Sequence, residues 1–108
     1  MKILKATYNQ EYPYWVACIG PDTRVYAYIS KTNLFHYSHA LDLDYYWDMD
    51  MDYVTIEPSE AVDLINSGIG QLDESKAWVV ERLIASEWSL SADEVLGEAA
   101  GGIHRDGA

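Results

Sequence analysis

The fold is decided by residues 14–30, which read YWVACIGPDTRVYAYIS. Residues 14–19 are rich in β-branched and aromatic side chains, which favour a strand. Residues 20–23, Gly-Pro-Asp-Thr, form a strong turn signal because proline fixes φ and aspartate can hydrogen-bond its own backbone. A second run of strand-forming residues follows directly. The stretch therefore predicts an antiparallel hairpin.

The second half of this hairpin, Arg24–Ser30, alternates and therefore has two distinguishable faces. The face expected in the core consists of Val25, Ala27 and Ile29. The face expected at the surface consists of Arg24, Tyr26 and Tyr28. Exposed tyrosines give a large contact area at a small entropy cost, so Tyr26 and Tyr28 are candidate partner-binding residues.

The longest alternation in the chain runs from Leu41 to Tyr53. Its odd positions are apolar or aromatic: Leu41, Leu43, Tyr45, Trp47, Met49, Met51 and Tyr53. Its even positions are acidic apart from one tyrosine: Asp42, Asp44, Tyr46, Asp48, Asp50 and Asp52. We expect a strand with one buried face and one acidic face, bent near Tyr45 and Tyr46 because the run is long for a single strand.

On either side of these stretches the patterns are shorter. Residues 2–8 are expected to form a further strand, whereas residues 31–40 fit a short helix or an ordered loop equally well. The chain after the long alternation is expected to be helical. A first helix is bounded by Pro58, at a first helical position, and by Gly68 just beyond its last turn.

Two more helices are expected toward the C-terminus. One runs from about Asp73 to Ser86 or Trp88, and Trp78 projects away from its apolar stripe. The other begins at Ser91, which with Glu94 forms a capping box. A hydrophobic staple is expected between the two apolar residues that flank this cap, Leu90 and Val95.

These elements predict an α+β domain of two layers, with an antiparallel sheet of three to four strands packed against two to three helices. The length of 108 residues leaves room for one hydrophobic core and not for two independent ones. We therefore expect a single compact domain over residues 1–100 and a flexible C-terminal tail over residues 101–108.

The charge is concentrated in the middle of the chain. The formal net charge is −11, and residues 32–75, which contain no Lys or Arg, account for −10 of it. Such a balance disfavours direct binding to nucleic acid or to an anionic membrane, because both need excess positive charge. The sequence also lacks a long apolar run, so we expect a cytoplasmic protein, in a bacterial or phage-infected cell.

Signatures of catalysis and of metal binding are scarce. Cys18 lies in an apolar strand and is expected to be a buried, inert thiol. The run from Asp48 to Asp52 begins like a calcium loop, but Tyr53 and Ser59 stand where an EF-hand needs glycine and glutamate. We expect neither an enzyme nor a cofactor. The alternative is a small metal-binding or enzymatic domain that uses His36 and His39 with a nearby aspartate.

The acidic face of the expected strand is the candidate binding site. Carboxylates two residues apart on one strand face are spaced about 6.6–6.8 Å apart, a pitch comparable to that of phosphates along a nucleic acid. The following helix extends the row, and four aromatic residues add contact area. The predicted partner-binding residues are Asp42, Asp44, Asp48, Asp50, Asp52, Glu57, Glu60, Asp63, Tyr26, Tyr28, Tyr46 and Trp78.

This pattern predicts a small non-enzymatic inhibitor that blocks a basic surface of a partner protein, such as a nucleic-acid-binding effector or a nuclease. In size and composition the chain is similar to phage-encoded anti-CRISPR and anti-restriction proteins that mimic DNA. The alternative within this chemistry is an immunity protein or antitoxin that neutralises a basic toxin. A homodimer is left open, because no residue pattern specifies or excludes one.

Overall fold

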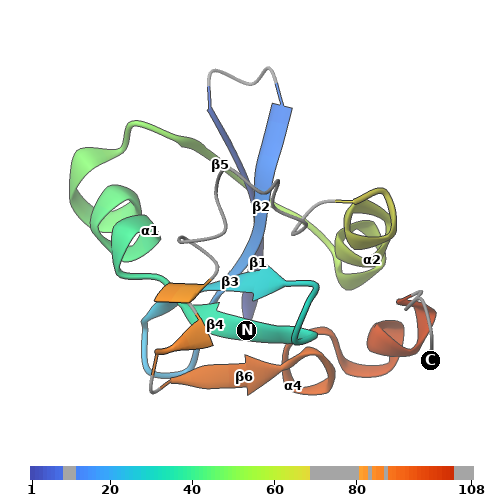
Figure 1. Cartoon of the computed structure of the whole chain (residues 1–108). Helices are drawn as coiled ribbons and strands as arrows, with labels where there is room; N and C mark the ends of the chain where they lie inside the picture. The colour runs from blue at the N-terminus through green and yellow to red at the C-terminus, as the bar shows by residue number, and fades with distance from the viewer. Residues whose placement is uncertain (9–11, 69–80, 83, 87, 104–108) are drawn as a thin grey trace.

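The computed structural model of the chain describes residues 1–8, 12–68, 81–82, 84–86 and 88–103 (Figure 1). The strands are β1 (Lys2–Tyr8), β2 (Tyr12–Ile19), β3 (Val25–Ile29), β4 (Leu34–Tyr37), β5 (Asp52–Thr55) and β6 (Ser89–Ser91). The helices are α1 (His39–Leu43), the π-helix η1 (Asp44–Asp48), α2 (Pro58–Asn66), α4 (Ala92–Leu96) and the 3₁₀-helix η3 (Gly97–Gly102).

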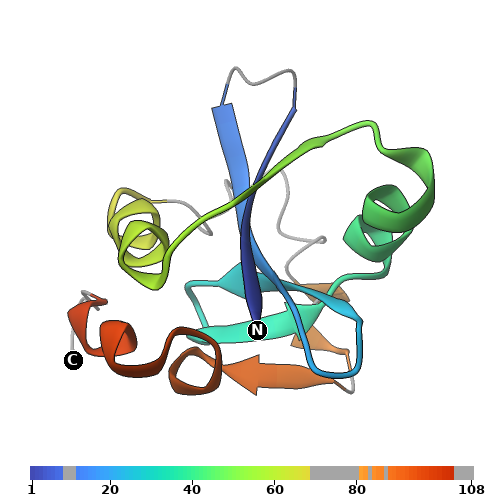
Figure 2. The same cartoon turned by 180° about the vertical axis from the view of Figure 1, so that it is seen from behind.

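The strands form one six-stranded sheet in the order β5-β1-β2-β3-β4-β6, and every neighbouring pair is antiparallel. The α+β class is confirmed, with a sheet larger than the expected three to four strands. The sheet is strongly twisted, so that the β1–β2 hairpin and the β4–β6 pair run in clearly different directions (Figures 1 and 2).

The hairpin between β2 and β3 is confirmed, with Ala17 opposite Ala27. Its turn is closed by a hydrogen bond from the Thr23 N–H to the Gly20 carbonyl oxygen, at 3.0 Å. A Cβ atom at Gly20 would lie only 2.9 Å from both Asp22 Oδ1 and Tyr26 Cε1. Glycine is therefore required here by the close approach of two side chains.

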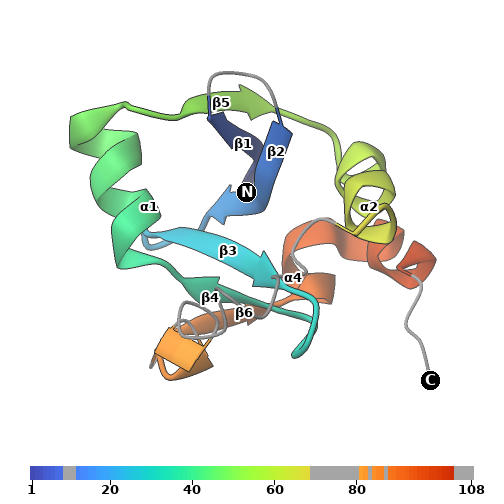
Figure 3. The same cartoon turned by 45° about the horizontal axis from the view of Figure 1, so that its top comes forward.

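Helices lie on both faces of the sheet, so the expected two-layer arrangement is wrong (Figures 1 and 3). On one face α2 and α4 pack over a core that includes Val16, Phe35 and Ile65. On the other face α1 contributes Leu41 to a second, smaller core. β3 runs between the two cores, and all five of its residues are buried.

The burial of β3 on both faces corrects the predicted exposure of Tyr26 and Tyr28. Their relative exposures are only 2% and 1%. The alternation itself is present, because both tyrosines enter the α2-side core whereas Val25 and Ala27 enter the other one. Each tyrosine hydroxyl reaches an acceptor at the end of the strand: Asp22 Oδ2 for Tyr26, and Asn33 Oδ1 for Tyr28.

The segment 31–40 is not the single short helix or loop expected, and only its last two residues are helical, as the start of α1. It contains the strand β4, whose side chains Phe35 and His36 are buried between β3 and β6. The turn before β4 places Asn33 at φ 56°, a conformation that asparagine tolerates better than most residues. A four-residue strand leaves too short a pattern to recognise from sequence.

The helices that begin at local sequence signals are confirmed. α2 has Pro58 in its first turn, and Gly68 follows its last turn at φ 108°. α4 begins with the complete capping box between Ser91 and Glu94. The helix predicted from about Asp73 lies mostly outside the described residues, and within it residues 81, 82 and 84 are helical. No helix in the described part of the chain is long and apolar enough to span a membrane.

The C-terminal boundary differs from the one expected. η3 continues through Gly102, and Ile103 packs against the α2-side core. The side-chain amide of Asn66 also donates to the Gly102 carbonyl oxygen, at 3.0 Å. The folded part therefore reaches Ile103, whereas residues 104–108 of the predicted tail lie outside the described residues.

Candidate protein-binding surface

The predicted acidic strand over residues 41–53 is a helical segment followed by a short strand, so this prediction was wrong. Ser38 caps the segment, since its hydroxyl oxygen accepts a hydrogen bond from the Leu41 N–H. Asp42 lies in the first turn, where a negative charge is favoured by the helix dipole. Leu41 and Tyr45, one helical turn apart, both pack in the smaller core.

The segment ends in a π-helix that turns the chain back toward the sheet. The Met49 N–H donates to the Asp44 carbonyl oxygen at 2.6 Å, and Met49 itself adopts φ 52°. A methionine in this left-handed conformation costs about 1 kcal/mol or more. Both π-helical turns and strained backbone recur at functional sites.

Asp44 holds this reversal together. One of its carboxylate oxygens accepts the Asp50 N–H at 3.0 Å. The other accepts the Met51 N–H at 3.2 Å and the Tyr53 hydroxyl at 2.6 Å. Burial and the hydrogen bond to Asp44 raise the pKa of Tyr53 well above its usual range. Asp44 is thus a structural residue and not part of an exposed acidic row.

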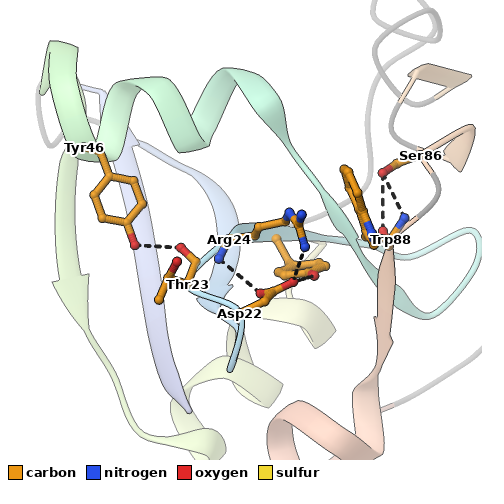
Figure 4. A network of polar contacts seen from close by, with 7 residues as sticks. Asp22, Thr23, Arg24, Tyr46, Ser86 and Trp88 are labelled. Atoms are coloured by element: carbon orange, nitrogen blue, oxygen red, sulfur yellow. Dashed lines mark hydrogen bonds and ion pairs between the residues drawn. The ribbon is translucent and has the colours of Figure 1, made fainter.

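A second contact fixes the segment to the turn between β2 and β3. The Tyr46 hydroxyl donates to the Thr23 carbonyl oxygen at 2.7 Å (Figure 4). Thr23 itself adopts φ 67°, a conformation uncommon for a β-branched residue. The helical segment is therefore attached to the sheet at both ends and in the middle, which leaves its outer side as a defined surface.

That outer side carries large apolar side chains. Trp47 is 79% exposed and Met49 is 74% exposed, while Tyr46 and Leu43 are 46% and 42% exposed. Leu43 ends α1, and Tyr46 and Trp47 lie in η1, which follows it directly. Asp48 and Asp50, both exposed, lie beside Trp47 and Met49 in the chain. We call this set, Leu43, Tyr46, Trp47, Asp48, Met49 and Asp50, the Trp47 surface.

The structure divides the twelve predicted site residues among several places. Asp48, Asp50 and Tyr46 belong to the Trp47 surface, whereas Asp42 and Asp52 are half-buried beside it. Glu57, Glu60 and Asp63 are exposed on or before α2, on the opposite side of the sheet from α1 (Figures 1 and 3). Asp44, Tyr26 and Tyr28 are used inside the fold, and Trp78 lies outside the described residues.

Three residues of the Trp47 surface were missed because they were assigned to a buried strand face: Leu43, Trp47 and Met49. The signal that points to them is Ser38, which has a good N-cap side chain, followed by Leu41 and Tyr45 at helical spacing. Leu41 and Tyr45 are four positions apart, which places them on one face of a strand as well as on one face of a helix. Their spacing therefore does not distinguish the two structures.

A separate network of polar contacts involves Asp22 and Arg24, the residues on either side of Thr23 in the β2–β3 turn (Figure 4). Arg24 forms an ion pair with Asp22 at 2.8 Å, and its guanidinium lies 3.8 Å from the centre of the Trp88 ring. Desolvation acts to raise the pKa of Asp22, but hydrogen bonds from Tyr26 and Arg24 outweigh it and hold the pKa below its usual value. The exposed ring of Trp88 thus has an intramolecular partner, whereas no such contact is found for the Trp47 ring among the residues that the structure describes.

The residues of the metal-binding alternative are not brought together. His36 is buried in β4, where its Nε2 lies 2.7 Å from Thr32 Oγ1. His39 is exposed at the start of α1, with its Nδ1 3.2 Å from the Tyr37 hydroxyl. Among the described residues no group of three or more His, Cys, Asp or Glu side chains is placed to hold a metal ion. Burial raises the pKa of the Cys18 thiol to about 12, so little nucleophilic thiolate exists near neutral pH.

His36 gives the fold a pH dependence that can be measured. Its Nδ1 is buried without a hydrogen-bond partner in the described part of the chain, and burial lowers its pKa below the ordinary 6.5. Because the unfolded chain binds this proton more tightly, stability should be complete above pH 6.5 and decrease as the pH falls below it. Urea unfolding followed from about pH 7.5 to pH 5.5 checks this, since carboxylates titrate mostly below that window. The decrease should disappear in His36→Gln and persist in His39→Gln, and an identical slope in both variants would contradict the assignment.

The chain was compared with protein-family models, with curated proteins and with solved structures, and none of the three comparisons gives a match.

Proposed function

We propose that the chain is a non-enzymatic binding protein that covers a basic surface of a partner protein with its Trp47 surface. The observation that carries this proposal is a tryptophan 79% exposed beside an exposed aspartate, in a stretch of 44 residues that contains no Lys or Arg. Tryptophan is enriched among the residues that dominate protein interfaces. Because its ring binds Lys and Arg through cation–π contacts, it fits the same partner as the neighbouring carboxylates.

The mode of binding differs from the one expected from sequence. A row of phosphate-like charges needs the aspartates on one extended face, and the helical segment removes that spacing. The structure supports a compact apolar surface flanked by acids, in which Trp47 and Met49 supply contact area and Asp48 and Asp50 supply charge. A nucleic-acid-binding effector, a nuclease or a basic toxin would each offer the complementary surface, so inhibitor and immunity protein remain the two forms of this proposal.

Titration of the protein with a synthetic lysine-rich peptide, followed by NMR, tests the proposal. Chemical-shift changes should concentrate on residues 43–50, and affinity should fall by about tenfold or more between about 50 mM and 500 mM salt. The double variant Asp48→Asn with Asp50→Asn should weaken binding by about fivefold or more.

A matched control is available on α2, where the variant Glu60→Gln with Asp63→Asn removes the same charge from the opposite side of the sheet. This control should bind within about twofold of the wild type, because the screening length at moderate salt is only about 10 Å. Equal losses of affinity in the two double variants, or an affinity that does not change with salt, would mean that the acids are only solvated surface residues. Either result would contradict the proposal.

A further inference from the structure

The edge strand β5 lies directly after the Trp47 surface in the chain and is paired on one side to β1 (Figure 3). The Ile56 N–H donates to the Ile3 carbonyl oxygen at 2.9 Å. Hydrogen-bonded pairs alternate along an antiparallel ladder, so Val54 next bonds to Lys5, opposite it in the register. The N–H and C=O groups of Tyr53 and Thr55 therefore point away from β1. No described strand lies there to receive them.

The side chains of β5 leave this edge accessible. Val54 is 50% exposed and Thr55 is exposed, whereas Tyr53 packs in the smaller core and keeps the strand in place. Edge strands are commonly protected by charged side chains, above all lysine, by proline or by a bulge. β5 has one charged residue, Asp52 at its first position, and contains neither lysine nor proline. Its pairing with β1 runs without a register shift.

The charge around the edge selects one kind of occupant. Acids stand on both sides of the accessible stretch, with Asp50 and Asp52 before it and Glu57 after it. A second copy of this chain would bring the same acids against them, which disfavours pairing of two β5 strands. An extended segment with Lys or Arg near both of its ends would meet complementary charge there.

We propose that the partner contributes an extended basic segment that adds to the sheet as a strand beside β5. The inference rests on the proposed function and specifies how the partner is bound. Backbone hydrogen bonds to Tyr53 and Thr55 provide the pairing, as in other cases of strand addition. Lysine or arginine side chains of the added strand reach the acids at either end, and the neighbouring Trp47 surface extends the contact.

Two peptides of about ten residues with identical Lys and Leu content test this mode. One alternates Lys and Leu, which favours a strand, and the other repeats them at helical spacing. The alternating peptide should bind at least tenfold more tightly, although the net charges are equal. In hydrogen exchange, the Tyr53 and Thr55 amides should exchange rapidly in the free protein and become protected in the complex.

A substitution that removes a backbone N–H of β5 distinguishes the contribution of strand pairing to binding from the contribution of charge. Thr55→Pro removes the outward N–H without removing a hydrogen bond to β1 and should weaken binding of the alternating peptide by about tenfold. Thr55→Ala keeps this N–H and should bind within about twofold of the wild type. If Thr55→Pro fails to fold, hydrogen exchange of the wild-type protein is the test: protection of the Tyr53 and Thr55 amides in the complex supports strand addition, and its absence contradicts it.

The outcomes distinguish the two proposals. If neither peptide binds at low salt, the proposed function fails and strand addition fails with it. If both bind equally at residues 43–50 while the Tyr53 and Thr55 amides stay unprotected, strand addition alone is overturned. A dimer of the free protein formed through β5, detected by sedimentation, would also overturn it.

Discussion

Replacing Trp47 with alanine is expected to weaken binding of the lysine-rich peptide by about 30-fold, or about 2 kcal/mol. The free energy of unfolding should change by no more than about 0.5 kcal/mol, because an exposed side chain that supports no core contributes little to stability. Calorimetric titration measures the first quantity and urea denaturation the second. A large effect on affinity together with a small effect on the free energy of unfolding indicates that the residue acts in binding and not in folding.

Trp88→Ala is the matched control for the loss of an exposed indole. Trp88 stacks on Arg24 and packs against Tyr37 with ring centres 5.3 Å apart, so its loss should destabilise the protein while binding stays within about twofold. Equal binding by wild type and Trp47→Ala would remove the Trp47 surface from the proposal, whatever the result for Trp88.

Asp44→Asn is expected to lower the free energy of unfolding by about 2–3 kcal/mol. The wild-type carboxylate accepts three hydrogen bonds, from two backbone N–H groups and the Tyr53 hydroxyl. The amide of asparagine keeps one acceptor oxygen and turns a donor toward donors, so at least one N–H or hydroxyl loses its partner. The chain reversal between η1 and β5 depends on these bonds, and binding through the Trp47 surface should weaken as well.

Asp48→Asn removes the same charge from the same segment and isolates the effect of the hydrogen bonds. Asp48 is exposed at the end of η1, so the free energy of unfolding should stay within about 0.5 kcal/mol of the wild type. Urea denaturation of the two variants under one set of conditions provides the comparison. Similar stabilities would mean that Asp44 is one more surface carboxylate and that other contacts hold the reversal.

Sequence alone was sufficient where a local signal decides the structure. The β2–β3 hairpin follows from its turn residues, α2 from Pro58 and Gly68, and α4 from the capping box at Ser91. Each of these signals acts through hydrogen bonds or backbone angles within a few residues. They are readable because no distant part of the chain has to be known.

Sequence failed where burial is decided by distant segments. Tyr26 and Tyr28 are buried because α2 and α4 pack over a face of the sheet that the local pattern of β3 assigns to solvent. The Leu41–Tyr53 stretch misleads for a different reason, since its buried residues fit strand and helix periods equally well. The acids of this stretch are evident from the sequence, but Trp47, its most exposed large side chain, was assigned to the buried face.

The turn at residues 20–24 has a consequence for the order of folding. It receives Tyr46 from the middle of the chain and holds Trp88, near the C-terminal helices, through Arg24. Contacts between such widely separated residues close long loops and slow the search for the native state. The turn forms early from local residues, and Tyr46 can reach it before half of the chain has been synthesised, whereas Trp88 reaches Arg24 only near the end. The hydrogen bonds that hold the segment carrying the Trp47 surface all lie within residues 23–53, so this surface can form before the C-terminal part of the chain closes over the other side of the turn.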